Sequence, residues 1–206
     1  MYARSTTVQA DPQRLDSGVA YARDEVLPML QGMTGFVGLS VLVDRGGGRC
    51  IATTAWDSEE SMHASTDSIQ PIRERFSELL GGAPTVHEWE IAVLHRRRET
   101  GDGAWARVSW TRADSSQMNR ILEAWRSSVV PQLDEIPGFC GASLLVDRST
   151  GRAATAVTYA DRDSVQAARD AATALRNSFT QQMGIQIDDI AECEVALAHL
   201  RVPETV

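Results

Sequence analysis

The sequence predicts an α+β protein made of two copies of one β-α-β-β-α-β unit. The main evidence is a repeated stretch, which reads TGFVGLSVLVDR over residues 34–45 and PGFCGASLLVDR over residues 137–148. The two stretches lie 103 positions apart, and most of the chain aligns with itself at this offset, as expected of an internal repeat. In each stretch a glycine-bearing turn precedes an apolar, β-branched run, a pattern typical of a strand.

The first half of each unit is predicted from its apolar spacing and its helix-capping residues. β-Branched residues predict a strand over 2–8, and Asp11-Pro12 then supplies a helix N-cap followed by proline at the first helical position. Apolar residues at three- or four-residue steps predict an amphipathic helix that follows, with a distorted last turn near Pro28. Strands are expected over 39–43 and 50–56, joined by a glycine-rich hairpin.

The second half of the unit holds another helix and a fourth strand. Asp57 or Ser58 is expected to cap this helix, and Pro71 is expected to break or kink it. A fourth strand follows over 86–94. The second copy has the same order, and the charged segment 96–103 joins the two. We therefore expect one repeat over residues 1–95, a linker over 96–103 and a second repeat over 104–202.

This element order is that of the ferredoxin-like fold, a four-stranded antiparallel sheet with both helices on one face. The other face of the sheet must also be covered, because a bare apolar sheet face is an interaction surface. Since the chain carries a second, equivalent face, we expect the two ferredoxin-like repeats to pack their antiparallel sheets into a barrel within one chain. Such a chain is a pseudo-dimer, and a homodimer of chains stays open.

Composition and charge narrow the classes of partner. A net charge of -8 argues against non-specific binding to nucleic acid and against docking on anionic membranes. The chain shows neither a signal-peptide pattern at its start nor an apolar run of the roughly 18 residues that a membrane span needs. Three cysteines without metal-like spacing (Cys50, Cys140 and Cys193) predict no metal site and favour a cytoplasmic location.

Two motifs resemble the antibiotic-biosynthesis-monooxygenase-like family of the dimeric α+β barrel superfamily. They are the Gly-Phe-x-Gly turn at 35–38, repeated at 138–141, and the Trp-Asp-Ser-Glu stretch at 56–59 that ends the third strand. Family members usually form the barrel from two chains, so the resemblance implies a tandem version. It also implies a monooxygenase that acts on an aromatic or polycyclic phenol without a cofactor. The haem-degrading branch of the family uses an Asn, a Trp and a His. This branch is disfavoured here, because only the Trp is matched, by Trp56, and His63 lies about one helical turn too early.

Trp56, His63 and Arg4 are the predicted catalytic residues, in the first copy. Trp56 would stack on a flat substrate, His63 would act as a general base, and Arg4 would stabilise a phenolate. The residues predicted to bind substrate are Tyr159, Arg107, Phe76 and Phe179.

Each candidate also has a structural interpretation. Trp56 and Tyr159 are of the size and type that fill a core, and His63 fits an exposed helix face. Arg4 and Arg107 would form cross-strand ion pairs with Glu88 and Glu192, because the first and last strands of this fold are neighbours.

Two functions follow from these alternatives. The first is a small-molecule enzyme, a cofactor-independent monooxygenase. The second is a non-catalytic ligand-binding or stress-related barrel protein. The second interpretation rests on the copies, which agree at folding positions such as Phe36 and Phe139 but differ where His63 stands opposite Gln166.

Overall fold

The computed structural model describes residues 1–101 and 103–200, which form an α+β fold with an antiparallel closed barrel. The strands are hydrogen-bonded in the order β1-β3-β2-β8-β5-β7-β6-β4, so the fold class predicted from the repeats is confirmed. Two compact units share these strands: residues 1–89 with 194–200, and residues 90–193. Within the described residues, no helix is long and apolar enough to cross a membrane.

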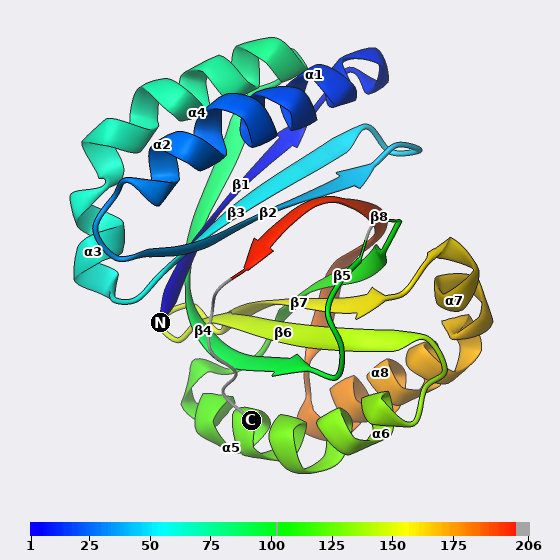
Figure 1. Cartoon of the computed structure of the whole chain (residues 1–206). Helices are drawn as coiled ribbons and strands as arrows, with labels where there is room; N and C mark the ends of the chain where they lie inside the picture. The colour runs from blue at the N-terminus through cyan, green and yellow to red at the C-terminus, as the bar shows by residue number, and fades with distance from the viewer. Residues whose placement is uncertain (102, 201–206) are drawn as a thin grey trace. The chain divides into compact units, whose positions relative to one another are not determined.

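The first unit has three strands of its own and helices on one face of their sheet (Figure 1). The middle strand β3 pairs antiparallel with both β1 and β2. The elements of this half of the chain are β1 (Tyr2–Gln9), η1 (Pro12–Arg14), α1 (Leu15–Tyr21), η2 (Ala22–Val26), α2 (Leu27–Gln31), β2 (Phe36–Asp44), β3 (Arg49–Trp56), α3 (Glu59–Ala64), α4 (Thr66–Leu80) and β4 (Pro84–Arg96).

The second unit repeats this order, again with its helices on one face of the sheet (Figure 1). Strand β7 is the middle strand and pairs antiparallel with β5 and β6. The elements are β5 (Trp105–Arg112), η3 (Ser115–Gln117), α5 (Met118–Ala124), η4 (Trp125–Val129), α6 (Val130–Asp134), β6 (Phe139–Asp147), β7 (Arg152–Tyr159), α7 (Arg162–Ala167), α8 (Arg169–Met183) and β8 (Gln186–Leu200).

The last strand of each repeat crosses from one unit into the other. Residues 90–96 of β4 pair with β6, and residues 194–200 of β8 pair with β2. The duplicated Asp-Arg dipeptides hold these incoming strand ends: Arg45 pairs with Glu194 at 2.8 Å, and Arg148 pairs with Glu90. The compact units therefore do not end at the predicted repeat boundaries, which describe the sequence duplication. Of the predicted linker and second repeat, residues 102, 201 and 202 lie outside the described part.

The prolines act differently in the two helices of the unit. The helix is distorted near Pro28, but ahead of the predicted last turn: it widens into a π turn over 22–26, and the last turn, 27–31, is α-helical. Pro131 is preceded by the same π turn in the second unit. The predicted break at Pro71 is wrong, because α4 continues through it. The proline ring is exposed there, so the carbonyl that loses its helical partner is open to water. The helix is interrupted earlier, at Ser65, whose hydroxyl donates to the Met62 carbonyl at 2.6 Å.

Each unit has its own hydrophobic core between its sheet and its helices. In the first unit this core includes the fully buried side chains Trp56, Leu15 and Leu80; in the second it includes Phe139 and Tyr159. The two cores differ in how completely they fill this space, and the difference creates the candidate site.

Candidate functional site

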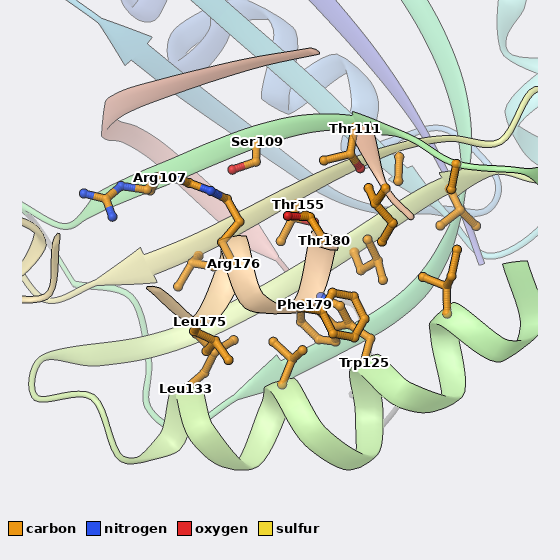
Figure 2. A pocket seen from close by; sticks show the side chains of 18 of the residues that line it. Arg107, Ser109, Thr111, Trp125, Leu133, Thr155, Leu175, Arg176, Phe179 and Thr180 are labelled. Atoms are coloured by element: carbon orange, nitrogen blue, oxygen red, sulfur yellow. The ribbon is translucent and has the colours of Figure 1, made fainter. Parts of the chain in front are cut away.

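A cavity lies between the sheet and the helices of the second unit. The space open to the centres of water-sized molecules is ≈ 100 Å³, against ≈ 50 Å³ in the equivalent cavity of the first unit. Figure 2 shows most of the lining side chains; the lining comes from the strands on one side and from α5, η4, α6 and α8 on the other. Those that carry the argument below are Arg107, Trp125, Tyr159, Ala172, Arg176 and Phe179.

The first unit is closed at one end by a close contact between its two long helical segments. Leu80 of α4 is fully buried, and a Cβ atom added to Gly18 of α1 would meet its Cδ2 atom at 2.6 Å. The second unit has Ile121 and Met183 at these two positions, and Met183 is only half-buried. Helices α1 and α4 pack closely, whereas α5 and α8 show no comparable approach. Ile121 lines the second-unit cavity at the position where Gly18 lets α1 approach α4 closely in the first unit.

The cavity has mostly aromatic and aliphatic walls, with two arginines at one end and the hydroxyl groups of Ser109, Thr111, Thr155 and Thr180 along its lining. Trp125 and Phe179 present their rings, and Figure 2 places Arg107 of β5 and Arg176 of α8 at the same end of the pocket. Trp125 stands where the first unit has Ala22, and Ala172 stands where it has Ile69. A concave apolar site with a few polar groups at one end is the usual form of a small-molecule site.

In the first unit the strand-one arginine is fully engaged by protein groups. Arg4 is 3% exposed, and its guanidinium donates to Glu88 through Nε at 2.9 Å. Nη1 donates to Ser65 Oγ at 3.2 Å, and Nη2 donates to the Met62 carbonyl and to Thr66 Oγ1, both at 3.0 Å. The predicted ion pair of Arg4 with Glu88 is confirmed. Arg4 therefore ties strand β1 to the junction of α3 and α4.

In the second unit the equivalent arginine keeps a free donor. Arg107 is 6% exposed and donates from Nη2 to Glu192 Oε1 at 2.7 Å, which confirms the second predicted ion pair. Arg169 binds both oxygens of the same carboxylate, at 3.2 and 3.1 Å. Arg107 Nη1 is buried, and no hydrogen-bond partner for it exists among the described residues. Because Arg107 lines the cavity, this donor is available to a ligand there.

Tyr159 supplies a second buried donor of this kind. Its side chain is fully buried, it lines the cavity, and its hydroxyl has no partner within residues 1–101 and 103–200. Burial raises the pKa of Tyr159, although the nearby Arg107 charge acts in the opposite direction, so the hydroxyl stays protonated and able to donate. In the first unit the equivalent Trp56 is satisfied, since its indole Nε1 donates to Thr54 Oγ1 at 3.0 Å.

Arg176 adds positive charge beside Arg107. Burial and the neighbouring Arg107 charge lower the pKa of Arg176 from its usual value, which is the effect expected when two cations are held close together. Arg176 nevertheless remains charged, because an arginine loses its proton only at very high pH. An anion bound at this end of the cavity would relieve the repulsion between them.

The predicted site residues fall into two groups. Arg107, Tyr159 and Phe179 line the second-unit cavity together. Arg4 and Phe76 line the smaller cavity of the first unit.

The remaining two candidates do not line either cavity. Trp56 packs edge-on against Phe36 with ring centroids 5.8 Å apart. The side chain of His63 is 54% exposed and pairs with Glu88 at 3.0 Å. The structure thus gathers the predicted substrate-binding residues of the second unit, but it separates Trp56 and His63 from a binding space.

Sequence reasoning missed Trp125 and Arg176 as site residues. The signal was present in the repeat alignment, where a tryptophan replaces Ala22 and an isoleucine replaces Gly18. Only the packing of α5 and α8 shows what these replacements do.

Solved structures with the same fold include monooxygenase-type proteins. An anthrone oxidase-like protein is 13% identical, with a TM-score of 0.69 over 98% of this chain and 94% of that one. A monooxygenase-like protein from Listeria innocua is 10% identical, with a TM-score of 0.54 over 95% and 94%. At such identities the similarity shows the fold alone.

Two proteins of Mycobacterium tuberculosis strain H37Rv are much closer in sequence. The uncharacterised protein Rv2557 is 48% identical over 206 residues, which is 100% of this chain and 92% of that protein. The uncharacterised protein Rv2558 is 45% identical over 207 residues, covering 100% of this chain and 88% of that protein. No protein-family model matches the sequence. Identity at this level over the full length shows common descent, and the chain belongs to the family of Rv2557 and Rv2558.

Proposed function

We propose that this protein is a small-molecule enzyme of the monooxygenase kind, which oxidises an aromatic phenolic substrate in the second-unit cavity without a cofactor. The observation that carries the proposal is the pair of buried, unused donors, Arg107 Nη1 and the Tyr159 hydroxyl, at one end of an aromatic-walled cavity. The fold that the chain shares with monooxygenase-type proteins supports the reaction class. The resemblance to antibiotic-biosynthesis monooxygenases remains part of this proposal.

The residues of the cavity suit a substrate that reacts with oxygen as its own anion. Arg107 and Tyr159 would hold the phenolic oxygen and favour its ionised form, because both donate to an oxygen acceptor. Trp125 and Phe179 would hold the rings in a water-poor space. Arg107 and Tyr159 would thus stabilise the phenolate, the role predicted from the sequence for Arg4, whose donors are occupied in the first unit.

The proposed reaction balances without an external reductant. An anthrone-type CH₂ group loses a proton to water, and the resulting carbanion forms a C–O bond with O₂ to give a peroxide. Protonation of the peroxide, loss of the second C–H proton and cleavage of the O–O bond leave a ketone and one water. The substrate carbon loses four electrons, which reduce both oxygen atoms: one stays in the ketone and the other leaves as water. Among the residues that line the cavity, none offers an imidazole or thiolate to a haem iron, so no haem step is proposed.

Oxygen consumption with anthrone and hydroxylated anthrones tests this function, with ¹⁸O₂ to confirm that one labelled atom enters the product. Tyr159→Phe is expected to lower kcat/KM by about 10-fold, the value of one hydrogen bond to an ionised oxygen. Full activity in Tyr159→Phe together with loss of activity in His63→Ala would move the site to the first unit. No turnover above the uncatalysed rate with the whole panel would refute the enzyme.

A second function, ligand binding without turnover, is favoured by one observation. The side chains that line the cavity include no carboxylate and no imidazole, so the described lining holds no general base of ordinary pKa. Thermal stabilisation by an anthrone under anaerobic conditions, with no oxygen uptake in air, would support this binding function over the enzyme.

A further inference from the structure

Three positions near the cavity differ between the units in the same way. In the first unit each carries a hydroxyl that accepts a hydrogen bond from Arg4 or Trp56, and in the second unit the hydroxyl is gone. The replacements, first unit to second, are Ser65 to Ala168, Thr66 to Arg169, and Thr54 to Val157. The two unpartnered donors that line the second-unit cavity, on Arg107 and Tyr159, therefore stand at the positions of Arg4 and Trp56, whose acceptors the second unit has lost.

Ala168 and Arg169 determine which hydrogen bonds Arg107 of strand β5 can form. Ala168 is 4% exposed and offers no acceptor where Ser65 meets Arg4 Nη1. Arg169 lies where Thr66 accepts from Arg4 Nη2, and it binds both oxygens of Glu192. Arg107 consequently keeps one hydrogen bond to that carboxylate and holds Nη1 free in the cavity wall.

The charges around this donor specify what it binds. Arg107, Arg169 and Arg176 bring three positive charges to this end of the unit, and Glu192 is the one carboxylate that their described contacts include. Both orphan groups, Arg107 Nη1 and the Tyr159 hydroxyl, are donors. A ligand there must therefore supply oxygen acceptors and negative charge, and the aromatic walls suit a ring. A ring-borne oxyanion, either carboxylate or phenolate, meets all three requirements.

We propose that Ala168 and Arg169 are specificity-determining residues, which free Arg107 Nη1 and so favour recognition of an aromatic oxyanion by the second unit. The inference rests on the proposed use of the second-unit cavity, and it concerns binding rather than turnover. Neither residue lines the cavity, so each acts through Arg107. The first unit is the built-in comparison for this donor, because Ser65 and Thr66 occupy Arg4; its smaller cavity also holds Arg73, whose buried Nε has no partner among the described residues.

The test restores the first-unit residues in the full-length protein, as the double variant Ala168→Ser, Arg169→Thr. Its matched control is Ala168→Cys, Arg169→Val, which makes the same change of charge with side chains of similar size that are poor acceptors. Calorimetry would measure binding of 2-naphthoate and of its neutral isostere 2-naphthamide. A second pair of ligands, the phenolate arm, compares 4-nitrophenol with 4-nitroanisole at a pH above the pKa of 4-nitrophenol.

Wild-type protein is expected to bind one oxyanion per chain, at least about 10-fold more tightly than the neutral isostere. The serine–threonine variant should lose about 10-fold or more in affinity for the oxyanion, with the affinity for the neutral isostere unchanged. The cysteine–valine control should lose less than about 3-fold, the effect of one screened charge. The arm with the larger preference shows whether the anion is a carboxylate or a phenolate.

Equal losses in the two double variants, unchanged oxyanion affinity in the first, or no preference for an oxyanion in wild type would each overturn the inference. So would the absence of binding by every probe. Oxyanion binding without oxygen uptake would refute the proposed enzyme and leave the inference standing. Oxygen uptake with no preference for oxyanions would refute the inference alone.

Discussion

The same substitution at the two strand-one arginines should have unequal effects on stability. We expect Arg4→Met to destabilise the protein and Arg107→Met to change its stability little, although both residues are buried arginines paired with a glutamate. The two variants control for each other, because side chain, strand position and replacement are the same. The difference lies in what each guanidinium contacts.

The magnitude follows from the contacts of Arg4. Its guanidinium donates to Glu88, Ser65, Thr66 and the Met62 carbonyl. Hydrogen bonds to charged groups contribute about 1.5–3 kcal/mol each when the partner is left without water. Here Glu88 is 42% exposed and the Met62 carbonyl retains the Ser65 hydroxyl, so both are partly compensated. The expected loss in the free energy of unfolding is therefore about 2–4 kcal/mol.

For Arg107→Met, two contributions to the free energy of unfolding have opposite signs. Arg107→Met removes one hydrogen bond to Glu192, which keeps Arg169 as its partner. It also removes a buried donor that has no partner among the described residues, and burying such a group costs about 1–3 kcal/mol. The two contributions offset each other, and we expect a net change within about 1 kcal/mol of zero.

Urea unfolding of both variants, followed by tryptophan fluorescence and far-UV circular dichroism, measures this difference. In thermal unfolding, Arg4→Met should lower Tm by about 4–12 °C and Arg107→Met by less than about 4 °C. Equal destabilisation, or a larger loss in Arg107→Met, would show that Arg107 is a structural residue like Arg4. That result would refute the assignment of a free donor to the second unit.

Three further predictions concern the cavity, a turn and the response to pH. Ala172→Val places two methyl groups in the cavity, so it should weaken 2-naphthoate binding at least about 10-fold in calorimetry. The free energy of unfolding should stay within about 1 kcal/mol of wild type. Tighter binding of 2-naphthoate would contradict this prediction. Gly151→Ala should destabilise the protein by at least about 2 kcal/mol in urea unfolding, because Gly151 has φ +71° and an added Cβ would lie 2.0 Å from the Ala113 carbonyl oxygen. The hydrogen bond from Arg148 lowers the pKa of Glu90. The ionised carboxylate therefore stabilises the fold fully at pH values above its ordinary pKa of about 4.5. This contribution is lost as the pH falls through the lower pKa of the folded state. The loss of stability between neutral and acidic pH should thus be smaller in Arg148→Ala than in wild type, and identical pH profiles would count against the pair.

The arrangement of the strands was predictable only in part. The duplication, the element order and the antiparallel barrel follow from local patterns that repeat at a fixed offset, because turn residues and apolar spacing act within a few residues of the chain. The exchange of the ends of β4 and β8 was not predictable, since a strand's pairing partner depends on distant residues. The helix break at Ser65 instead of Pro71 was likewise not predicted, and the same break occurs at Ala168 in the second unit, where the position equivalent to Pro71 is an alanine.

The sequence by itself determined which arginines meet which glutamates, and it identified Arg107, Tyr159 and Phe179 as candidates that do line one cavity. It could not determine which copy holds the larger cavity, and Trp56 and His63 directed attention to the first. That difference is a matter of packing: α1 approaches α4 closely at Gly18, whereas Ile121 at the equivalent position lines the cavity of the second unit. A free donor is likewise a property of the folded chain alone, because a guanidinium is free only when every neighbour within reach fails to accept from it.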